Sequence, residues 1–148
     1  MISHFSQVEN CFFERSNLAE PTTPVPHIVV KNVPDLGLLT ALRFLEWTAD
    51  NPQGVISLPT GKTPEYFIKW TQQILANWND TKIEKLRREH GLSVSDKPDL
   101  RQLRFVQIDE FYPIDPQQHN SMFNYVQKFY VNGFGLDPKN CLLINCAE

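Results

Sequence analysis

Apolar runs of strand length alternate along the chain with longer stretches in which apolar residues recur at helical spacing. The short runs predict four strands, at residues 27–31, 54–58, 103–108 and 141–145. The longer stretches predict three helices, which open at Pro34, Pro64 and about Asn120. Strands that alternate with helices are typical of a mostly parallel sheet with helices on its faces. The pattern therefore predicts an α/β fold.

The helix after the second predicted strand has the clearest start signal. A proline suits the first position of a helix, so we expect Thr63 to be the N-cap and Pro64 the first helical residue. The apolar face of this helix is predicted to contain Tyr66, Phe67, Trp70, Ile74 and Trp78. The third helix is predicted to end at Gly133 and Gly135.

Two further segments surround this alternating pattern. Residues 1–20 predict a short amphipathic helix, and three prolines before residue 27 impose an extended linker. We therefore expect an N-terminal helix and Pro-rich linker over residues 1–26 and an α/β domain over residues 27–148. Residues 79–102 are polar and predict an exposed helix followed by a loop.

Length, composition and charge exclude several classes of protein. The chain has 148 residues, of which 41% are hydrophobic and 21% charged, as in one ordinary globular domain. Its net charge of −3 argues against a nucleic-acid-binding protein, which needs a basic surface. The basic stretch 82–104 lacks interleaved aromatic residues, so it predicts a solvated face.

The location of the protein is predicted from its cysteines and from its apolar runs. Three cysteines without a CxxC motif indicate a reduced protein, and the N-terminus lacks the pattern of a signal peptide. No apolar run reaches the length of about 18 residues that a membrane span needs. We therefore expect a cytoplasmic protein without a membrane partner, and the sequence is compatible with an oligomer.

A phosphate site is the first candidate function. Thr60, Gly61, Lys62 and Thr63 lie where a predicted strand ends and a helix begins. The unpaired N–H groups and the dipole of a helix start attract an anion, and Lys62 adds a positive charge. An ordinary strand-to-helix turn is the alternative. A nucleotide-binding P-loop is rejected, because Ile56 stands where that motif needs glycine.

An acidic pair is the second candidate site. Asp109 and Glu110 follow the third predicted strand, at the edge where open α/β sheets bind ligands. A carboxylate there can remove a proton from a carbon that a neighbouring carbonyl or imine activates. The alternative is an Asp that initiates a turn beside a solvated Glu. The histidines and cysteines have no metal-ligand spacing, so no metal site is predicted.

Several spaced motifs together resemble the glucosamine-6-phosphate deaminase/isomerase family. The resemblance covers about residues 28–145 and rests on the segments Val55–Pro64, Gln107–Phe111, Asn120–Phe123 and Phe134–Asn140. It implies a Rossmann-like three-layer α/β/α sandwich. It also implies a small-molecule sugar-phosphate partner and a reaction that converts glucosamine 6-phosphate and water to fructose 6-phosphate and ammonia.

The same resemblance assigns roles to the candidate residues. Thr60, Gly61, Lys62 and Thr63 correspond to the loop that binds the sugar phosphate, and Asp109 corresponds to the base that moves a proton between C2 and C1. Glu110 is expected to line the site. No metal or organic cofactor is implied, because ring opening already activates the amine-bearing carbon.

The chain also departs from the family pattern. Lys62 stands where the familiar deaminases have a small residue, and residues 79–102 are longer than the usual connection. The later Gly-Asn-Asp-Gly-His segment, which supplies the ring-opening histidine, has no counterpart before Glu148. We therefore expect a truncated, N-terminal part of a longer enzyme that has no deaminase activity by itself.

Two alternative functions stay open at this point. A 6-phosphogluconolactonase has a similar phosphate loop, and the segment with Pro113, Asp115 and Asn120–Ser121 is similar to the lactonase loop. Against it, the loop Pro59–Lys62 and the triplet Asp109–Phe111 differ from the lactonase motifs Ser-Gly-Gly-Ser and Asp-Glu-Arg. The second alternative is a non-catalytic module that binds a sugar phosphate.

Overall fold

The computed structural model of the chain describes residues 5–16 and 27–147, so the predicted Pro-rich linker lies outside the described residues. In chain order, the elements are α1 (Gln7–Ser16), α2 (Val33–Asp50), β1 (Val55–Ile56), α3 (Glu65–Ala76), α4 (Thr81–Glu89), η1 (Leu100–Gln102), β2 (Arg104–Val106), α5 (Met122–Val126), the π-helical turn η2 (Gln127–Val131), α6 (Asn132–Phe134), η3 (Pro138–Asn140) and β3 (Cys141–Leu142).

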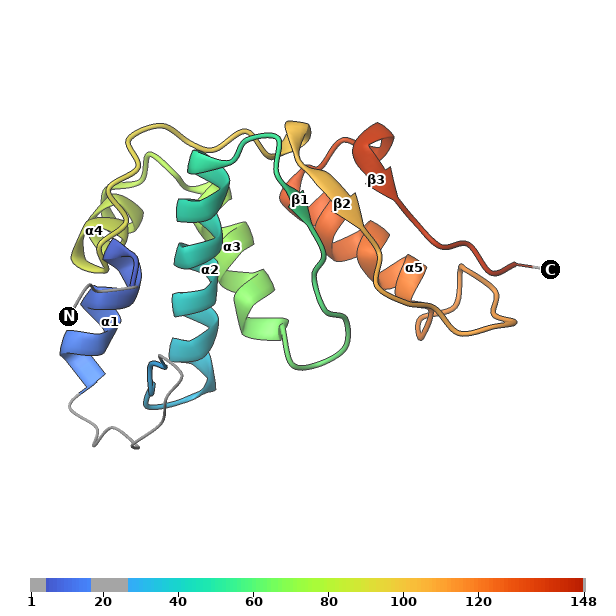
Figure 1. Cartoon of the computed structure of the whole chain (residues 1–148), viewed down its shortest axis with the longest axis horizontal. Coiled ribbons are helices and arrows are strands. Elements are labelled where there is room, and N and C mark those ends of the chain that lie inside the picture. The colour runs from blue at the N-terminus through green and yellow to red at the C-terminus, as the bar shows by residue number, and fades with distance from the viewer. Residues whose placement is uncertain (1–4, 17–26, 148) are drawn as a thin grey trace.

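The three strands form a parallel sheet in the order β1-β2-β3. Val55 pairs with Arg104, and Phe105 pairs with Cys141. Figure 1 shows the sheet and α5 at one end of the molecule, α1 and α4 at the other end, and α2 and α3 between them. The predicted α/β class with a parallel sheet is confirmed, and parallel strands place all their carboxyl ends at one edge.

The two faces of the sheet differ in burial. Phe105 is fully buried on the face that packs against the helices, where its ring lies 5.8 Å from that of Tyr130. Successive residues of a strand point to opposite faces. On the second face, Val55 is 61% exposed and Leu142 is 68% exposed. Within the described residues, the helices therefore cover one face, and the second face has no covering layer.

A cluster of three phenylalanines joins the helices above the sheet. The rings of Phe44 in α2, Phe67 in α3 and Phe134 in α6 lie 5.6–5.7 Å apart, and two of the three ring pairs have edge-to-face geometry. All three side chains are buried. Aromatic pairs of this kind contribute about 0.5–1.5 kcal/mol beyond the burial of their area. The cluster therefore connects α2 and α3 to the helix that follows β2.

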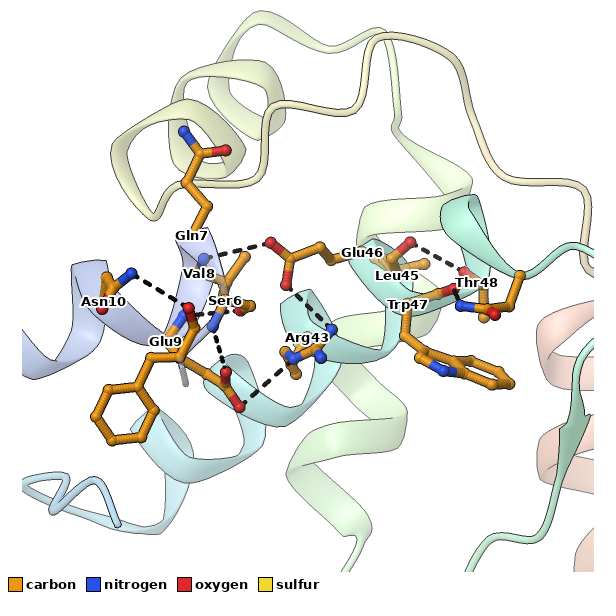
Figure 2. A network of polar contacts seen from close by, with 12 residues as sticks. Ser6, Gln7, Val8, Glu9, Asn10, Arg43, Leu45, Glu46, Trp47 and Thr48 are labelled. Carbon is orange, nitrogen blue, oxygen red and sulfur yellow. Dashed lines mark hydrogen bonds and ion pairs between the residues drawn. The ribbon is translucent and has the colours of Figure 1, made fainter. Parts of the chain in front are cut away.

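Helix α1 is attached to α2 through polar contacts, which Figure 2 shows. Ser6 and Glu9 form a capping box: the Glu9 N–H donates to Oγ of Ser6, and the Ser6 N–H donates to the Glu9 carboxylate. Arg43 of α2 lies 3.4 Å from Glu9 and 3.2 Å from Glu46, and so bridges the two helices. The predicted N-terminal helix is confirmed over residues 7–16.

Two local predictions are wrong. Residues 27–31 do not form a strand, since β1 pairs with β2 alone among the described strands. The side chains of Ile28 and Val30 still pack against the core. Tyr66 does not belong to the buried face of α3 and is 38% exposed. The burial pattern turns Phe67, Ile68, Thr71, Ile74 and Leu75 to the core instead.

The prediction of a helix over residues 120–131 is confirmed with two differences. Helix α5 begins at Met122, and the following turn is π-helical before α6 resumes the α-helix. Gly133 lies inside α6, and Gly135 ends it.

No helix within residues 5–16 or 27–147 combines the length and the apolar character that crossing a membrane requires.

Gly37 controls how closely α2 approaches α3. A Cβ atom at this position would overlap Cβ of Tyr66 and would lie 2.7 Å from the Tyr66 carbonyl carbon and 2.8 Å from the Phe67 nitrogen. These are mainly backbone atoms at the start of α3, which cannot move aside without shifting the helix. Gly37 therefore fixes the position of α3 against α2.

We expect Gly37→Ala to lower the free energy of unfolding by about 1–3 kcal/mol through overpacking. The gain of about 1 kcal/mol that alanine brings to a helix interior offsets part of this loss, so the net decrease should reach up to about 2 kcal/mol. Urea denaturation followed by circular dichroism measures the change. Gly133→Ala is the matched control, since its new Cβ would overlap only the terminal amide of the long Gln72 side chain, which can rotate away, and would lie 3.3 Å from the Lys128 carbonyl oxygen. Equal stability of the two variants would contradict the close-approach argument.

Candidate functional site

The loops that follow the three parallel strands gather at the carboxyl edge of the sheet. They comprise residues 57–64 after β1, residues 107–121 after β2 and residues 143–147 after β3. The first loop is joined directly to the end of β2, because Oγ of Ser57 donates to the Val106 carbonyl oxygen at 2.6 Å. Open α/β sheets bind their ligands at this edge.

The loop at residues 60–63 combines a glycine in the left-handed region with backbone N–H groups that no described residue binds. Gly61 has a φ of +89°, which favours glycine, and the space beside its Cα is open. Within the part of the chain that the structure describes, the backbone N–H groups of residues 60–63 have no hydrogen-bond partner. The loop therefore offers a row of unused donors directly before a helix.

The predicted cap of α3 is wrong. The helix begins at Glu65 with Pro64 in the N-cap position, and no side chain caps it. The Glu65 N–H donates to the Lys62 carbonyl oxygen at 3.2 Å, which closes a turn just ahead of the helix. This turn moves the helix start one residue beyond Pro64. The Thr63 side chain consequently stays exposed.

The side chains of the loop divide into one that is held and two that are exposed. The Thr60 hydroxyl contacts the sulfur of Met122 at 2.7 Å. The side chains of Lys62 and Thr63 are exposed and form no hydrogen bond or ion pair with any described residue. The hydrogen bond and the charge of Lys69 hold the pKa of the Glu65 carboxyl below its ordinary value. The charge of Lys62 lowers this pKa further, but more weakly. The Lys62 ammonium thus stays available beside the unused N–H groups.

Two tyrosines hold the loop by its carbonyl groups. The Tyr125 hydroxyl donates to the Gly61 carbonyl oxygen at 2.8 Å, and the Tyr130 hydroxyl donates to that of Pro59. Burial raises the pKa of both phenols, so they stay protonated donors. The two tyrosines thus hold the loop without using the backbone N–H groups of residues 60–63.

Glu110 is bound to the start of α5. Its carboxylate accepts hydrogen bonds from the Ser121 hydroxyl at 2.7 Å, the Phe123 N–H at 2.7 Å and the Met122 N–H at 3.0 Å. Partial burial raises the pKa of Glu110, but these donors and the Phe111 N–H outweigh it and hold the pKa below its ordinary value. Glu110 is therefore an anchor of α5, and the alternative of a solvated Glu is wrong.

Asp109 has different surroundings from Glu110. Its side chain is exposed, and its carboxylate has no hydrogen-bond or ion-pair partner among the described residues. Its backbone is fixed, since Nε2 of the buried Gln107 donates to the Asp109 carbonyl oxygen at 2.8 Å. The same Gln107 amide accepts from the Ile144 N–H at 3.0 Å and so joins the ends of β2 and β3.

Contacts between the loops connect the two candidate sites. Thr60 contacts Met122 of α5, and Gly61 contacts Tyr125 of the same helix. The start of α5 is bound by the carboxylate of Glu110, which is adjacent to Asp109 in the sequence.

Among the described residues, no group of three or more His, Cys, Asp or Glu side chains lies close enough together to hold a metal ion.

Sequence reasoning missed the residues that hold the loops. Gln107, Ser121, Tyr125 and Tyr130 bind backbone groups or carboxylates of other segments. A signal exists for two of them. Ser121 caps α5, as serine commonly does, and Gln107 is a polar residue at an inward position of an apolar strand. The tyrosine contacts depend on the tertiary fold and leave no local pattern.

No family model matches the chain, and no curated protein matches it by sequence. Among solved structures, the chain is similar to one described as a monomeric glucosamine-6-phosphate deaminase and as a missing link of the NagB superfamily. The TM-score is 0.61 at 16% sequence identity. The match covers 78% of this chain and 41% of that chain, so this chain spans less than half of the similar structure. At this identity, the likeness establishes the fold.

Glu110→Gln tests the anchor of α5. An amide keeps one acceptor oxygen but turns an NH₂ group toward the N–H donors, so we expect a loss of about 1–3 kcal/mol in the free energy of unfolding at pH 7. Urea denaturation measures it. Glu14→Gln is the matched control, because Glu14 is an exposed helical glutamate that forms no hydrogen bond or ion pair with another described residue.

The loss in Glu110→Gln should depend on pH. The pKa of Glu110 is lower in the folded chain than its ordinary value of 4.5, so its contribution is complete above that value and falls as pH drops through the folded pKa. The stability difference between wild type and Glu110→Gln should therefore shrink toward zero in acid. A difference that stays constant from neutral pH into acid would contradict the role of the charge.

Proposed function

We propose that the chain binds a sugar phosphate at the carboxyl edge of its sheet, with the phosphate at residues 60–63 and Asp109 as the base that acts on the sugar. The observation that carries this proposal is the row of unpartnered N–H groups around Gly61, at the start of α3 and on the same sheet edge as an unpaired carboxylate. Asp109 would carry out the proton transfer between C2 and C1 that belongs to the reaction of a glucosamine-6-phosphate deaminase.

The physics of the loop supports a phosphate ligand. A phosphate needs several donors that converge on one point, and a helix start adds a partial positive charge there. The absent Cβ of Gly61 leaves open space in which an oxygen can approach the backbone. Lys62 can swing its ammonium to the same point, since no described residue binds it.

The surroundings of Asp109 support its role as a base. Proton abstraction needs a carboxylate whose oxygens are not taken by donors and whose backbone is fixed. Asp109 meets both conditions, because its side chain is exposed and Gln107 holds its carbonyl group. Glu110 does not meet the first condition, since four donors bind it. The fold likeness to a glucosamine-6-phosphate deaminase and the motif resemblance support the same assignment.

Gly61→Val should abolish the preference of the chain for a phosphorylated sugar. Its branched side chain would fill the open space where the phosphate approaches. Isothermal titration with glucosamine 6-phosphate and with glucosamine measures the preference. Gly135→Val is the matched control, because Gly135 also has a positive φ, of +75°, and open space beside it. A folded Gly61→Val that keeps the wild-type preference would exclude this loop as the phosphate site.

Lys62→Ala should have a milder effect, because the backbone donors remain. A hydrogen bond to a charged group contributes about 1.5–3 kcal/mol, so the affinity for glucosamine 6-phosphate should fall by roughly 10- to 150-fold. The same titration measures it, with Lys97→Ala as the control for loss of an exposed lysine. An unchanged affinity would show that Lys62 is a solvated residue of an ordinary turn.

Asp109→Asn should retain binding and lose proton transfer. Exchange of the C2 proton of glucosamine 6-phosphate with deuterium oxide, followed by NMR, needs only the base and the sugar that opens spontaneously. General-base catalysis contributes about 10²–10⁴-fold, so exchange should fall by at least this factor. Asp115→Asn, in the same loop and also exposed, is the control. Equal exchange in wild type and Asp109→Asn would exclude Asp109 as the base.

A further inference from the structure

Arg87 is a buried cation at the end of the molecule remote from the strands. It lies in the last turn of α4 and is only 6% exposed. Its guanidinium group donates to the Val94 carbonyl oxygen at 2.9 Å and to that of Trp78 at 3.1 Å, and stacks 3.7 Å from the centre of the Trp78 ring. Arg87 thereby ties the loop after α4 to the turn between α3 and α4.

Arg87 has no ion-pair partner within the described residues. Its Nε has no hydrogen-bond partner among them either. Burial lowers the pKa of Arg87, and the nearby Glu84 opposes this shift. Arginine keeps its proton even so. A buried cation without a counter-ion is costly, and a bound anion removes much of that cost.

A pocket lies directly beside this cation. It has a volume of about 470 Å³, and Arg87, Arg88 and Trp78 line it together with the polar residues Asn79, Ser93 and Ser95. Glu84 is the one acidic residue in the lining, against two arginines. A volume of this size accommodates a small organic molecule. The excess positive charge selects for an anion, and guanidinium groups match the geometry of carboxylates and phosphates.

We propose that this pocket binds a small molecule through a phosphate or carboxylate group, with Arg87 and Arg88 as its charge partners. The site is separate from the loop at residues 60–63. That loop precedes α3 and the pocket follows it, and a helix of 12 residues spans about 18 Å. Figure 1 shows α4 at the end of the molecule opposite the strands. The proposal does not depend on the function proposed above.

NMR spectroscopy of the ¹⁵N-labelled chain tests this site. The indole N–H of Trp78, which donates to the Ser95 carbonyl oxygen, reports on the pocket directly. Inorganic phosphate and malonate are titrated separately at constant ionic strength. We expect a saturable shift of the Trp78 indole signal with at least one of them. A shift with phosphate alone assigns a phosphate ligand, and a shift with malonate alone assigns a carboxylate.

Charge reversal at the rim of the pocket gives the matched variants. Arg88 and Lys82 are both exposed residues of α4, but only Arg88 lines the pocket. Arg88→Glu should weaken binding at least about tenfold relative to Lys82→Glu, which has the same net charge. Gly61→Val should leave the Trp78 shift unchanged. Absence of a saturable shift with both anions, or equal affinities in Arg88→Glu and Lys82→Glu, would overturn the proposal.

Discussion

The hydrogen bonds that Glu110 accepts from the start of α5 are the constraint on which the candidate site depends. They hold the end of β2 against α5, although ten residues separate Glu110 from Ser121. Helix α5 and the π-helical turn η2 carry Tyr125 and Tyr130, which bind the loop after β1 by its carbonyl groups. One carboxylate therefore fixes the geometry of two neighbouring strand ends.

Two consecutive carboxylates have different surroundings at this edge. Side chains of successive extended residues point to opposite sides, so Glu110 reaches the helix start and Asp109 faces solvent. Four donors stabilise the charge of Glu110, whereas Asp109 keeps its oxygens unpaired. In the proposed site, the first residue acts on the sugar and the second holds the helix that positions it.

The sequence predicted the elements that are determined locally. The parallel α/β pattern, α1, α2 and the positions of residues 60–63 and 109–110 at strand ends follow from apolar periodicity and from prolines and glycines. The strand expected at residues 27–31 and the Thr63 cap were wrong, because strand pairing and the turn at Lys62 depend on neighbours that a linear pattern does not show. The contacts of Tyr125 and Tyr130 and the burial of Arg87 also depend on tertiary packing, so the linear pattern does not reveal them.

The most direct measurement for the central claim is a titration of the ¹⁵N-labelled chain with glucosamine 6-phosphate, followed by its backbone amide signals. The account predicts that the amides of Gly61, Lys62 and Thr63 shift first and saturate together, because their N–H groups have no partner among the described residues. Glucosamine without the phosphate should leave these signals unchanged. Saturation that leaves these three amides in place, or equal shifts with both sugars, would contradict a phosphate site in this loop.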